Sequence, residues 1–468
     1  MLEEVFTTKR KALKINLDSK IYGTLAEIGG GQEVARAFFQ AGGASGTIAK
    51  SISAYDKTFS DMFYNDNKQG RHVSEDRLKK MLKKEFNELI QVLSDKKDYD
   101  TRFFAFADTV ETLNYKKTNK GHGWLGVRFQ LSPFSEPNQV IIHVNLKEND
   151  ALLQQYTLGA LGVNLIYACF HYYNYPNKFL TSLLDNLDTD RVEIDMAHMQ
   201  GPELDYVDNR LLSVQLVKNG MTEAVVFDNS GDIKQASDMF YKKNVMAFRG
   251  SFRPITKTGC DIIRSSKKLF EKDENYKPDN TISICEITLQ NLMNLGEFDE
   301  RDFLERVNIL NGLGQHVMVS NFREYYKLSD FFSRFKINQL RLIMGVPALN
   351  NILNVKYYEQ LSGGILEAFG RLFKKNVKLY VYPAKESDKL VTCNDLQLDD
   401  NVKLLFDFVK KNKLIMQLSP IDENNMGISS RVILEKIRNN DNSWENDVPE
   451  FVAEVIKKKR LFGYKKTD

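Results

Sequence analysis

Cysteine is scarce in this sequence, and the few cysteines are scattered. They stand at Cys169, Cys260, Cys285 and Cys393, with no C-x-x-C pair among them. A disulfide framework or a structural zinc site needs cysteines that are numerous or closely spaced. The pattern therefore argues against both, predicts no metal site, and is typical of a protein in the reducing cytoplasm.

Long apolar runs and an excess of one charge are also missing. The longest apolar run, Leu158–Phe170, is interrupted by Asn164. It is shorter than the roughly 20 residues that a membrane span needs, so we expect a buried core helix there. The first residues lack the basic-then-apolar order of a signal peptide. The net charge of +3 is too small to indicate a nucleic-acid partner. We therefore expect neither a membrane span nor binding to nucleic acid.

Hydrophobic periodicity divides the chain into four regions. They are a helical, glycine-rich N-terminal region, a mixed α+β region, an α/β core and a small, mainly helical C-terminal domain, over residues 1–100, 101–190, 191–384 and 385–468. Strand-like and helix-like segments alternate seven times through the core. Such alternation predicts a mostly parallel sheet, either doubly wound or closed into a barrel. The predicted fold class is therefore α/β.

The stretch GGGQEVARAFFQAGGASGTIAKSISAYD, from Gly29 to Asp56, is rich in glycine. It predicts two helix starts in tandem, one after Gly31 and one after Thr47, and the second helix carries an apolar stripe at Ile48, Ile52, Tyr55, Phe59 and Phe63. A helix N-terminus presents unpaired N–H groups and a positive dipole end to anions. The candidate cofactor- or anion-binding residues in this stretch are therefore Ser45, Gly46 and Thr47.

Neither of the two named phosphate motifs is complete in this stretch. A Walker A loop needs G-x-x-x-x-G-K-[ST]; Lys50 is followed by serine, but positions 44 and 49 are alanine. A dinucleotide fingerprint needs G-x-G-x-x-G after a strand, whereas position 34 is valine and LAEIGG is a poor strand. We therefore expect that Lys50 is not a Walker lysine and that Gly46→Val disrupts folding or assembly. The alternative is that the glycines serve close helix packing or a polymerisation surface.

The segment VEIDMAHM carries three polar groups that suit acid–base chemistry. Glu193 and Asp195 are two residues apart, so they share one face of the predicted strand, and His198 follows near its carboxyl end. Sites of parallel α/β folds form at that end. The candidate catalytic residues are therefore Glu193, Asp195 and His198. The alternative is an edge strand with a solvated face.

Two further places offer groups for binding. Arg249 and Arg253 flank a glycine after the strand VMAF and are candidate anion- or cofactor-binding residues, unless they pair with Glu193 or Asp195. His122 lies between two glycines and suits a base or a stacking group, or is a satisfied loop histidine. His143, in VIIHVNL, is placed to share a face with residues on an adjacent strand.

Several stretches, among them HGWLGVRFQ, YKKNVMAFRGSFRP and GGILEAFGRLF, resemble a family of uncharacterised bacterial proteins often labelled nicotinate-nucleotide adenylyltransferase. The resemblance extends over nearly the whole chain, and the label implies a nucleotide-like ligand. Enzymes of that class hold the triphosphate with a His-x-Gly-His turn. None of the six histidines stands in such a turn, so the resemblance assigns no catalytic residue.

The sequence leaves two functions open. The preferred one is a cytoplasmic, transferase-type enzyme that acts on a phosphorylated or nucleotide-like anionic small molecule, with no cofactor identified. The other is a non-catalytic, assembly-forming scaffold. We expect a homo-oligomer in either case. Open space around Arg249, Glu193 and Asp195 would favour the enzyme, and salt bridges among them would favour the scaffold.

Overall fold

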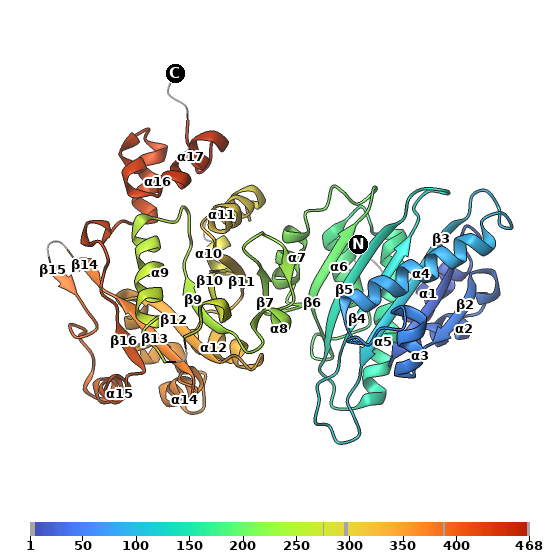
Figure 1. Cartoon of the computed structure of the whole chain (residues 1–468), viewed down its shortest axis with the longest axis horizontal. Coiled ribbons are helices and arrows are strands. Elements are labelled where there is room, and N and C mark those ends of the chain that lie inside the picture. Colours follow the sequence, from blue (N-terminus) through green and yellow to red (C-terminus); the bar gives the residue numbers. More distant parts are fainter. Residues whose placement is uncertain (1–4, 275, 294–297, 387–388, 466–468) are drawn as a thin grey trace. The chain divides into compact units, whose positions relative to one another are not determined.

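The structure is a computed structural model that describes residues 5–274, 276–293, 298–386 and 389–465 (Figure 1). The chain divides into two compact units, Met1–Thr222 and Glu223–Asp468, each with its own sheet. Helices connect many of the strands, and the central strands of the second sheet pair in parallel. The predicted α/β class is confirmed.

The first unit is built on a six-stranded mixed sheet in the order β2-β1-β3-β4-β5-β6. Its strands are β1 (Ile21–Gly29), β2 (Ile48–Ser53), β3 (Arg102–Glu111), β4 (His122–Phe129), β5 (Asn138–Leu146) and β6 (Val192–Gln200). β2, β1 and β3 are parallel, and β3 to β6 run antiparallel to one another. The carboxyl ends of β1 and β3 therefore lie at the same edge as the first residues of β4 and β6.

Helices cover both faces of this sheet. Phe104 and Phe106 of β3 join the main core with α1 (Thr8–Asn16), α2 (Gln32–Ala41) and α5 (Ala151–His171). The alternate residues Phe103 and Ala105 pack on the other face, against α4 (Glu75–Leu93). The remaining helices of the unit are α3 (Lys57–Tyr64), α6 (Pro176–Leu183) and α7 (Asn209–Lys218). The apolar run expected as a core helix lies within α5, where it is almost wholly buried.

Two expectations for the glycine-rich region are wrong. LAEIGG belongs to β1, and the predicted helix from residue 48 is the strand β2 followed by α3. Ile48 and Ile52 fit the four-residue spacing of a helix, but they also fit the two-residue period of a strand. The burial of β2 alternates with that shorter period. Residues 1–100 and 101–190 consequently contribute strands to one sheet, and β6, from the beginning of 191–384, forms its edge.

The second unit contains an eight-stranded sheet in the order β16-β13-β12-β9-β10-β11-β7-β8. Its strands are β7 (Ala224–Phe227), β8 (Ile233–Lys234), β9 (Asn244–Arg249), β10 (Thr281–Thr288), β11 (His316–Ser320), β12 (Gln339–Gly345), β13 (Val377–Tyr382) and β16 (Ile415–Gln417). The strands from β16 to β11 are parallel, whereas β7 and β8 are antiparallel additions at one edge. Over the described residues the sheet is open, so of the two predicted forms it matches the doubly wound one and not the barrel.

Helices also pack on both faces of this second sheet. Leu342 of β12 belongs to one hydrophobic cluster and the adjacent Ile343 to another. The helices are α8 (Ala236–Phe240), α9 (Lys257–Phe270), α10 (Leu289–Met293), α11 (Glu300–Gly312), α12 (Tyr325–Ser333), α13 (Val346–Ile352), α14 (Gly364–Leu372), α15 (Asp400–Lys411), α16 (Ser430–Arg438) and α17 (Glu450–Lys459). A small hairpin pairs β14 (Ala384–Glu386) with β15 (Lys389–Val391). The C-terminal region expected to be helical thus also supplies β16 to the sheet.

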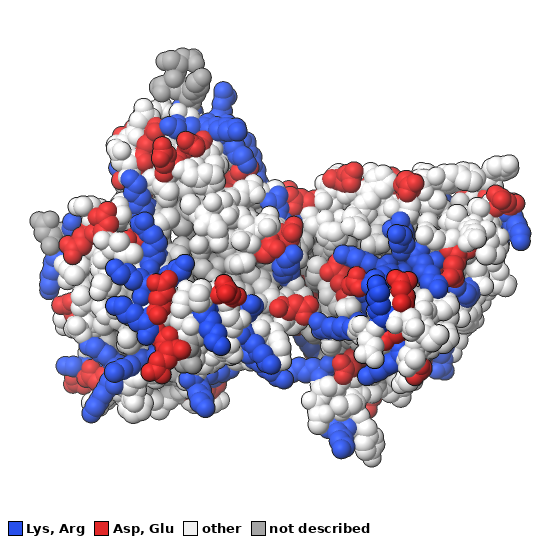
Figure 2. Space-filling model, viewed as in Figure 1, with Lys and Arg blue, Asp and Glu red and all other residues white. Residues whose placement is uncertain are grey.

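Charged side chains of both signs are interspersed over the visible face of each unit (Figure 2). Within the described ranges, no helix combines the length and the apolar content that crossing a bilayer requires.

Candidate functional site

A cavity of about 730 Å³ lies at the carboxyl edge of the parallel strands in the first unit. This size falls within the range of small-molecule sites, and the carboxyl edge is where ligands bind in open α/β sheets. Its wall includes the β1–α2 turn, the first turn of α3, the end of β3 and the start of β4. The chemically distinctive side chains in the wall are Tyr55, Lys57, Arg71, His72, Glu111 and His122.

Glycines shape the β1–α2 turn that borders this cavity. Gly29 has a φ of +92°, and a side chain there would overlap the carbonyl oxygen of Val110 on β3. A side chain at Gly31 would overlap the carboxylate of Asp108. The glycines therefore serve backbone geometry at the start of α2.

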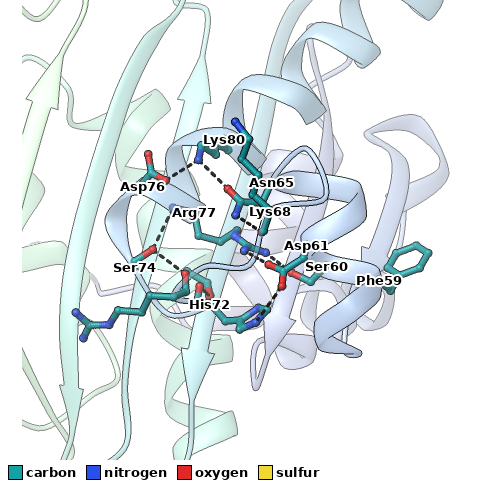
Figure 3. A network of polar contacts seen from close by, with 12 residues as sticks. Phe59, Ser60, Asp61, Asn65, Lys68, His72, Ser74, Asp76, Arg77 and Lys80 are labelled. Carbon is teal, nitrogen blue, oxygen red and sulfur yellow. Dashed lines mark hydrogen bonds and ion pairs between the residues drawn. The ribbon is translucent and has the colours of Figure 1, made fainter.

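A buried arginine fixes the wall formed by α3 and the segment that follows it (Figure 3). Arg77 is 1% exposed, donates to Ser60 Oγ at 2.6 Å and pairs with Asp61 on α3. Its backbone N–H donates to Ser74 Oγ, which itself donates to the carbonyl oxygen of Arg71. Phe59 points away from this network (Figure 3). Arg77 thus holds α3 through its side chain, and its backbone N–H joins α4 to the loop that carries Arg71 through Ser74.

The cationic side chains Lys57 and Arg71 give the cavity a positive character. Lys57 is exposed and makes no ion pair with any residue that the structure describes. The opposing carboxylate of Glu111 accepts a hydrogen bond from Asn119 Nδ2 at 2.7 Å. The pKa of His72 is lowered, first by burial, with Arg77 and Lys57 contributing and Asp61 opposing. These groups suit an anionic ligand.

Three side chains form a hydrogen-bonded chain that ends at the cavity. His122 Nδ1 lies 3.2 Å from His143 Nε2, and His143 Nδ1 lies 2.6 Å from Asp195 Oδ1. The second carboxylate oxygen of Asp195 accepts a hydrogen bond from Asn145 Nδ2 at 2.9 Å. His122 lines the cavity, whereas His143 is fully buried, with the ring of Trp124 centred 4.8 Å from it.

Strand register brings these three residues together. His122 opposes Asn145 across β4 and β5, so His122 and His143 lie on the same face, two positions apart in register. A β-bulge between His143 and Val144 interrupts the pairing of β5 with β6. The bulge leaves Asp195 as the extra residue on β6 and directs its carboxylate to His143.

Burial keeps the cavity end of this chain neutral. It lowers the pKa of His122 to about 4, with further lowering from His143 and Arg71. His122 is therefore an uncharged imidazole at neutral pH, which can accept a hydrogen bond but by itself holds an added proton only weakly.

A second polar pair lies behind the glycine turn. Glu27 on β1 and Asp108 on β3 occupy the same register position in adjacent strands. Asp108 is completely buried, and neither of its carboxylate oxygens has a hydrogen-bond partner among the described residues. Burial raises the pKa of Glu27 to about 7, and burial together with Glu27 raises the pKa of Asp108 well above its usual range.

The predicted catalytic residues have different surroundings. Asp195 belongs to the histidine chain, and Glu193 accepts a hydrogen bond from Thr222 Oγ1 at 2.7 Å. His198 lies opposite Ile141, farther along β6 than the pairing of His143 with Met196. Sequence reasoning named His122 and His143 separately and missed their partnership with Asp195, because the β5–β6 bulge leaves no local signal.

The residues proposed for anion binding lie elsewhere in their units. Ser45, Gly46 and Thr47 precede β2, so they stand at the amino edge of the parallel strands, opposite the cavity. The helix start on which that prediction rested does not exist. Lys50 reaches α4 instead and pairs with Glu85 at 2.6 Å and Glu88 at 3.1 Å.

The two arginines predicted to bind an anion, Arg249 and Arg253, both have acidic partners. Arg249 donates to the two carboxylate oxygens of Glu286 at 2.9 and 3.0 Å. Arg253 donates to Asp302 at 2.6 Å, a carboxylate that Arg306 also contacts. Their partners are thus not the Glu193 and Asp195 considered from the sequence, and an anion at either arginine must compete with a buried carboxylate.

No protein-family model matches the chain, and no curated protein sequence matches it. Among solved structures, the chain is similar to competence/damage inducible protein CihA from Agrobacterium tumefaciens, with a TM-score of 0.25 and 14% identity over 36% of this chain and 98% of that chain. It is likewise similar to a competence-damaged protein (CinA) superfamily protein from Escherichia coli, with a TM-score of 0.25 and 16% identity over 40% of this chain and 94% of that chain. A likeness of this degree carries no conclusion about function. None of these comparisons supports the nicotinate-nucleotide adenylyltransferase label.

Proposed function

We propose that the protein is an enzyme, of the transferase type, that acts on a phosphorylated or nucleotide-like anionic small molecule bound in the cavity of the first unit. The observation that carries this proposal is the neutral His122 at the cavity wall, backed by His143 and Asp195 and facing the same space as Lys57 and Arg71. A cavity with cationic groups and a pKa-shifted histidine combines binding with chemistry.

The anionic part of the ligand is assigned to the cationic side of the cavity. Lys57 and Arg71 provide positive charge, and the glycine turn lets the ligand approach the backbone at the start of α2. A helix N-terminus favours anions through its free N–H groups and its dipole. A phosphate group fits these surroundings better than a neutral or cationic group.

The cavity also offers aromatic surface for the rest of the ligand. Tyr55 and Tyr115 both line it, and their exposed fractions are 77% and 102%. Tyrosines that are so exposed contribute little to the core and are well suited to stacking on a planar ring. Their presence beside the cationic groups supports a nucleotide-like ligand over inorganic phosphate alone.

Titration calorimetry with AMP, ATP and inorganic phosphate tests this proposal. We expect the nucleotides to bind more tightly than phosphate, and we expect Lys57→Ala and Arg71→Ala each to weaken binding by about tenfold. Lys83→Ala, which removes an exposed lysine from α4, is the matched control and should bind as the wild type does. The absence of binding for all three ligands, or equal loss in the control, would reject the cavity as an anion site.

A scaffold function has one observation in its favour. On α3, Phe59 and Met62 are 48% and 62% exposed, which is unusual for large apolar side chains side by side on one short helix. Native mass spectrometry of the wild type and of Met62→Glu distinguishes this alternative. An oligomer that dissociates in the variant, without any loss of nucleotide binding, would assign α3 to assembly.

A further inference from the structure

We propose that His122 is the general base of the cavity and that His143 and Asp195 form a proton wire that carries the abstracted proton from the cavity to the outer strand β6. The role of His122 toward a ligand rests on the proposed function, whereas the direction of the wire rests on the three side chains alone.

The hydrogen-bond partners fix which ring nitrogens carry protons. The carboxylate of Asp195 only accepts hydrogen bonds, and it already accepts one from Asn145. The nitrogen that faces it, His143 Nδ1, must therefore carry a proton. We take His143 as a neutral imidazole, which has one N–H, so that its Nε2 presents a lone pair and His122 Nδ1 is the donor of that contact. The lone pair of His122 is then on Nε2.

Proton transfer along this chain is balanced at every step. A ligand group X–H gives its proton to His122 Nε2 as the X–H bond breaks, and the electron pair stays on X. The Nδ1 proton of His122 moves to His143 Nε2, and the Nδ1 proton of His143 moves to Asp195 Oδ1. Both rings end neutral in the opposite tautomer, X carries one negative charge, and Asp195 is a neutral acid.

The proton wire avoids a positive charge on His122, which its surroundings destabilise. Protonating His122 alone would create an imidazolium in a largely buried place beside the positive charge of Arg71, and both of these lower its pKa. Passing the proton on places it on Asp195 instead, whose side chain is 18% exposed and can exchange with water. In this scheme His143, which is fully buried, carries no charge before or after the transfer.

The competing explanation is a structural ion pair, in which a charged His143 donates from both ring nitrogens, to Asp195 and to His122 Nδ1. His122 would then carry its proton on Nε2 and present no lone pair to the cavity. The decisive quantities are therefore the protonation of His122 Nε2 and its chemical reactivity, and neither depends on knowing the substrate.

The first measurement is nitrogen NMR on the full chain labelled with ¹⁵N-histidine, at pH 7. We expect Nδ1 of both His122 and His143 to be protonated and Nε2 of His122 to be unprotonated, with assignments from single His122→Gln and His143→Gln proteins. A proton on His122 Nε2 in the wild type would overturn the proposal without reference to any variant that might fail to fold.

The second measurement is the rate at which diethyl pyrocarbonate modifies His122, followed by peptide mass spectrometry. This reagent attacks the lone pair of a neutral imidazole. Asp195→Asn lets the amide donate to His143 Nδ1 and so inverts both tautomers, which removes the Nε2 lone pair. We expect the rate at His122 to fall by about tenfold or more, with Asp195→Glu restoring part of it. Asp190→Asn, an exposed neighbour before β6, is the control and should react as the wild type does.

The two proposals fail in different ways. An unchanged rate in Asp195→Asn would overturn the proton wire, whatever the cavity binds. Correct tautomers and an Asp195-dependent rate, together with no nucleotide binding in calorimetry, would retain the wire and reject the ligand class.

Discussion

Glu27 and Asp108 are register partners on adjacent parallel strands, and they share a buried position where no cation from the described part of the chain perturbs them. Two such carboxyl groups cannot both be ionised without a large desolvation cost. Their presence beneath the glycine turn weakens the fold at high pH. Buried groups that lower the stability of a fold concentrate near functional sites. The cavity borders the same glycine turn.

Stability of the first unit should therefore fall as the pH rises through neutrality. The pKa of Glu27 is raised from 4.5 to about 7, so the folded protein holds this proton more tightly than the unfolded chain does. The contribution is complete below about pH 4.5 and is lost as the pH rises to about 7. Glu27→Gln should accordingly increase the free energy of unfolding at pH 8 by up to about 3 kcal/mol and change it little at pH 4.5.

Urea unfolding of the wild type and the variant at both pH values measures this effect. Glu136→Gln, which neutralises an exposed glutamate of the same unit, should show no such pH dependence. Equal stability of wild type and Glu27→Gln at pH 8 would mean that Glu27 is ionised without penalty in the folded protein.

Arg77 should contribute far more to stability than an exposed arginine does. Replacing it with methionine keeps the buried volume but leaves Asp61, which is 13% exposed, without its charged partner. We expect a loss of about 3–5 kcal/mol in the free energy of unfolding and faster amide hydrogen exchange in α3. Arg36→Met, in which the arginine is 58% exposed and pairs with Glu33, should cost less than about 1 kcal/mol. Similar losses for the two variants would contradict the role given to Arg77.

The glycine turn predicts a contrast between two glycines. Gly29→Ala forces a positive φ on alanine and an overlap with the Val110 carbonyl group, so it should cost about 2 kcal/mol or more. A Cβ at Gly46 has no heavy atom within 4 Å, so Gly46→Ala should change stability by less than about 0.5 kcal/mol. The open space at Gly46 gives no support to the expectation that Gly46→Val disrupts folding. Thermal unfolding of both variants measures this contrast. A severe loss of stability in Gly46→Ala alone would place Gly46 in a contact between subunits that leaves no room for a side chain.

The sequence predicted structure correctly where the pattern within a single helix or strand was sufficient. The apolar run ending at Phe170 forms a buried helix, and the alternation of VIIHVNL places His143 on a face that it shares with a neighbouring strand. The alternation from residue 191 onward correctly indicated α/β architecture. It also included β6, which pairs with β5 in the first sheet, because strand order is set by contacts between elements that sequence spacing does not record.

The histidine chain was beyond the reach of local patterns for the same reason. It depends on the register of β4 on β5 and on the bulge that presents Asp195 to His143. β2 was missed because isoleucines four residues apart satisfy both a helical and a strand period. Once β2 is a strand, Lys50 lies beside α4, and the cationic role in the cavity falls to Lys57.

Lys50 and Lys57 should therefore respond in opposite ways to the same substitution. Lys50→Ala leaves the carboxylate of Glu85, which is 0% exposed, without its cation, and we expect a loss of about 1–3 kcal/mol in the free energy of unfolding. Its affinity for ATP should remain that of the wild type, because Lys50 does not line the cavity. Lys57→Ala should retain wild-type stability, since the side chain is exposed and makes no ion pair among the described residues, but it should bind ATP more weakly. Paired urea unfolding and titration calorimetry separate the two lysines. Complete loss of magnesium-dependent ATP binding in a folded Lys50→Ala protein would show that the glycine-rich stretch is a divergent phosphate loop after all.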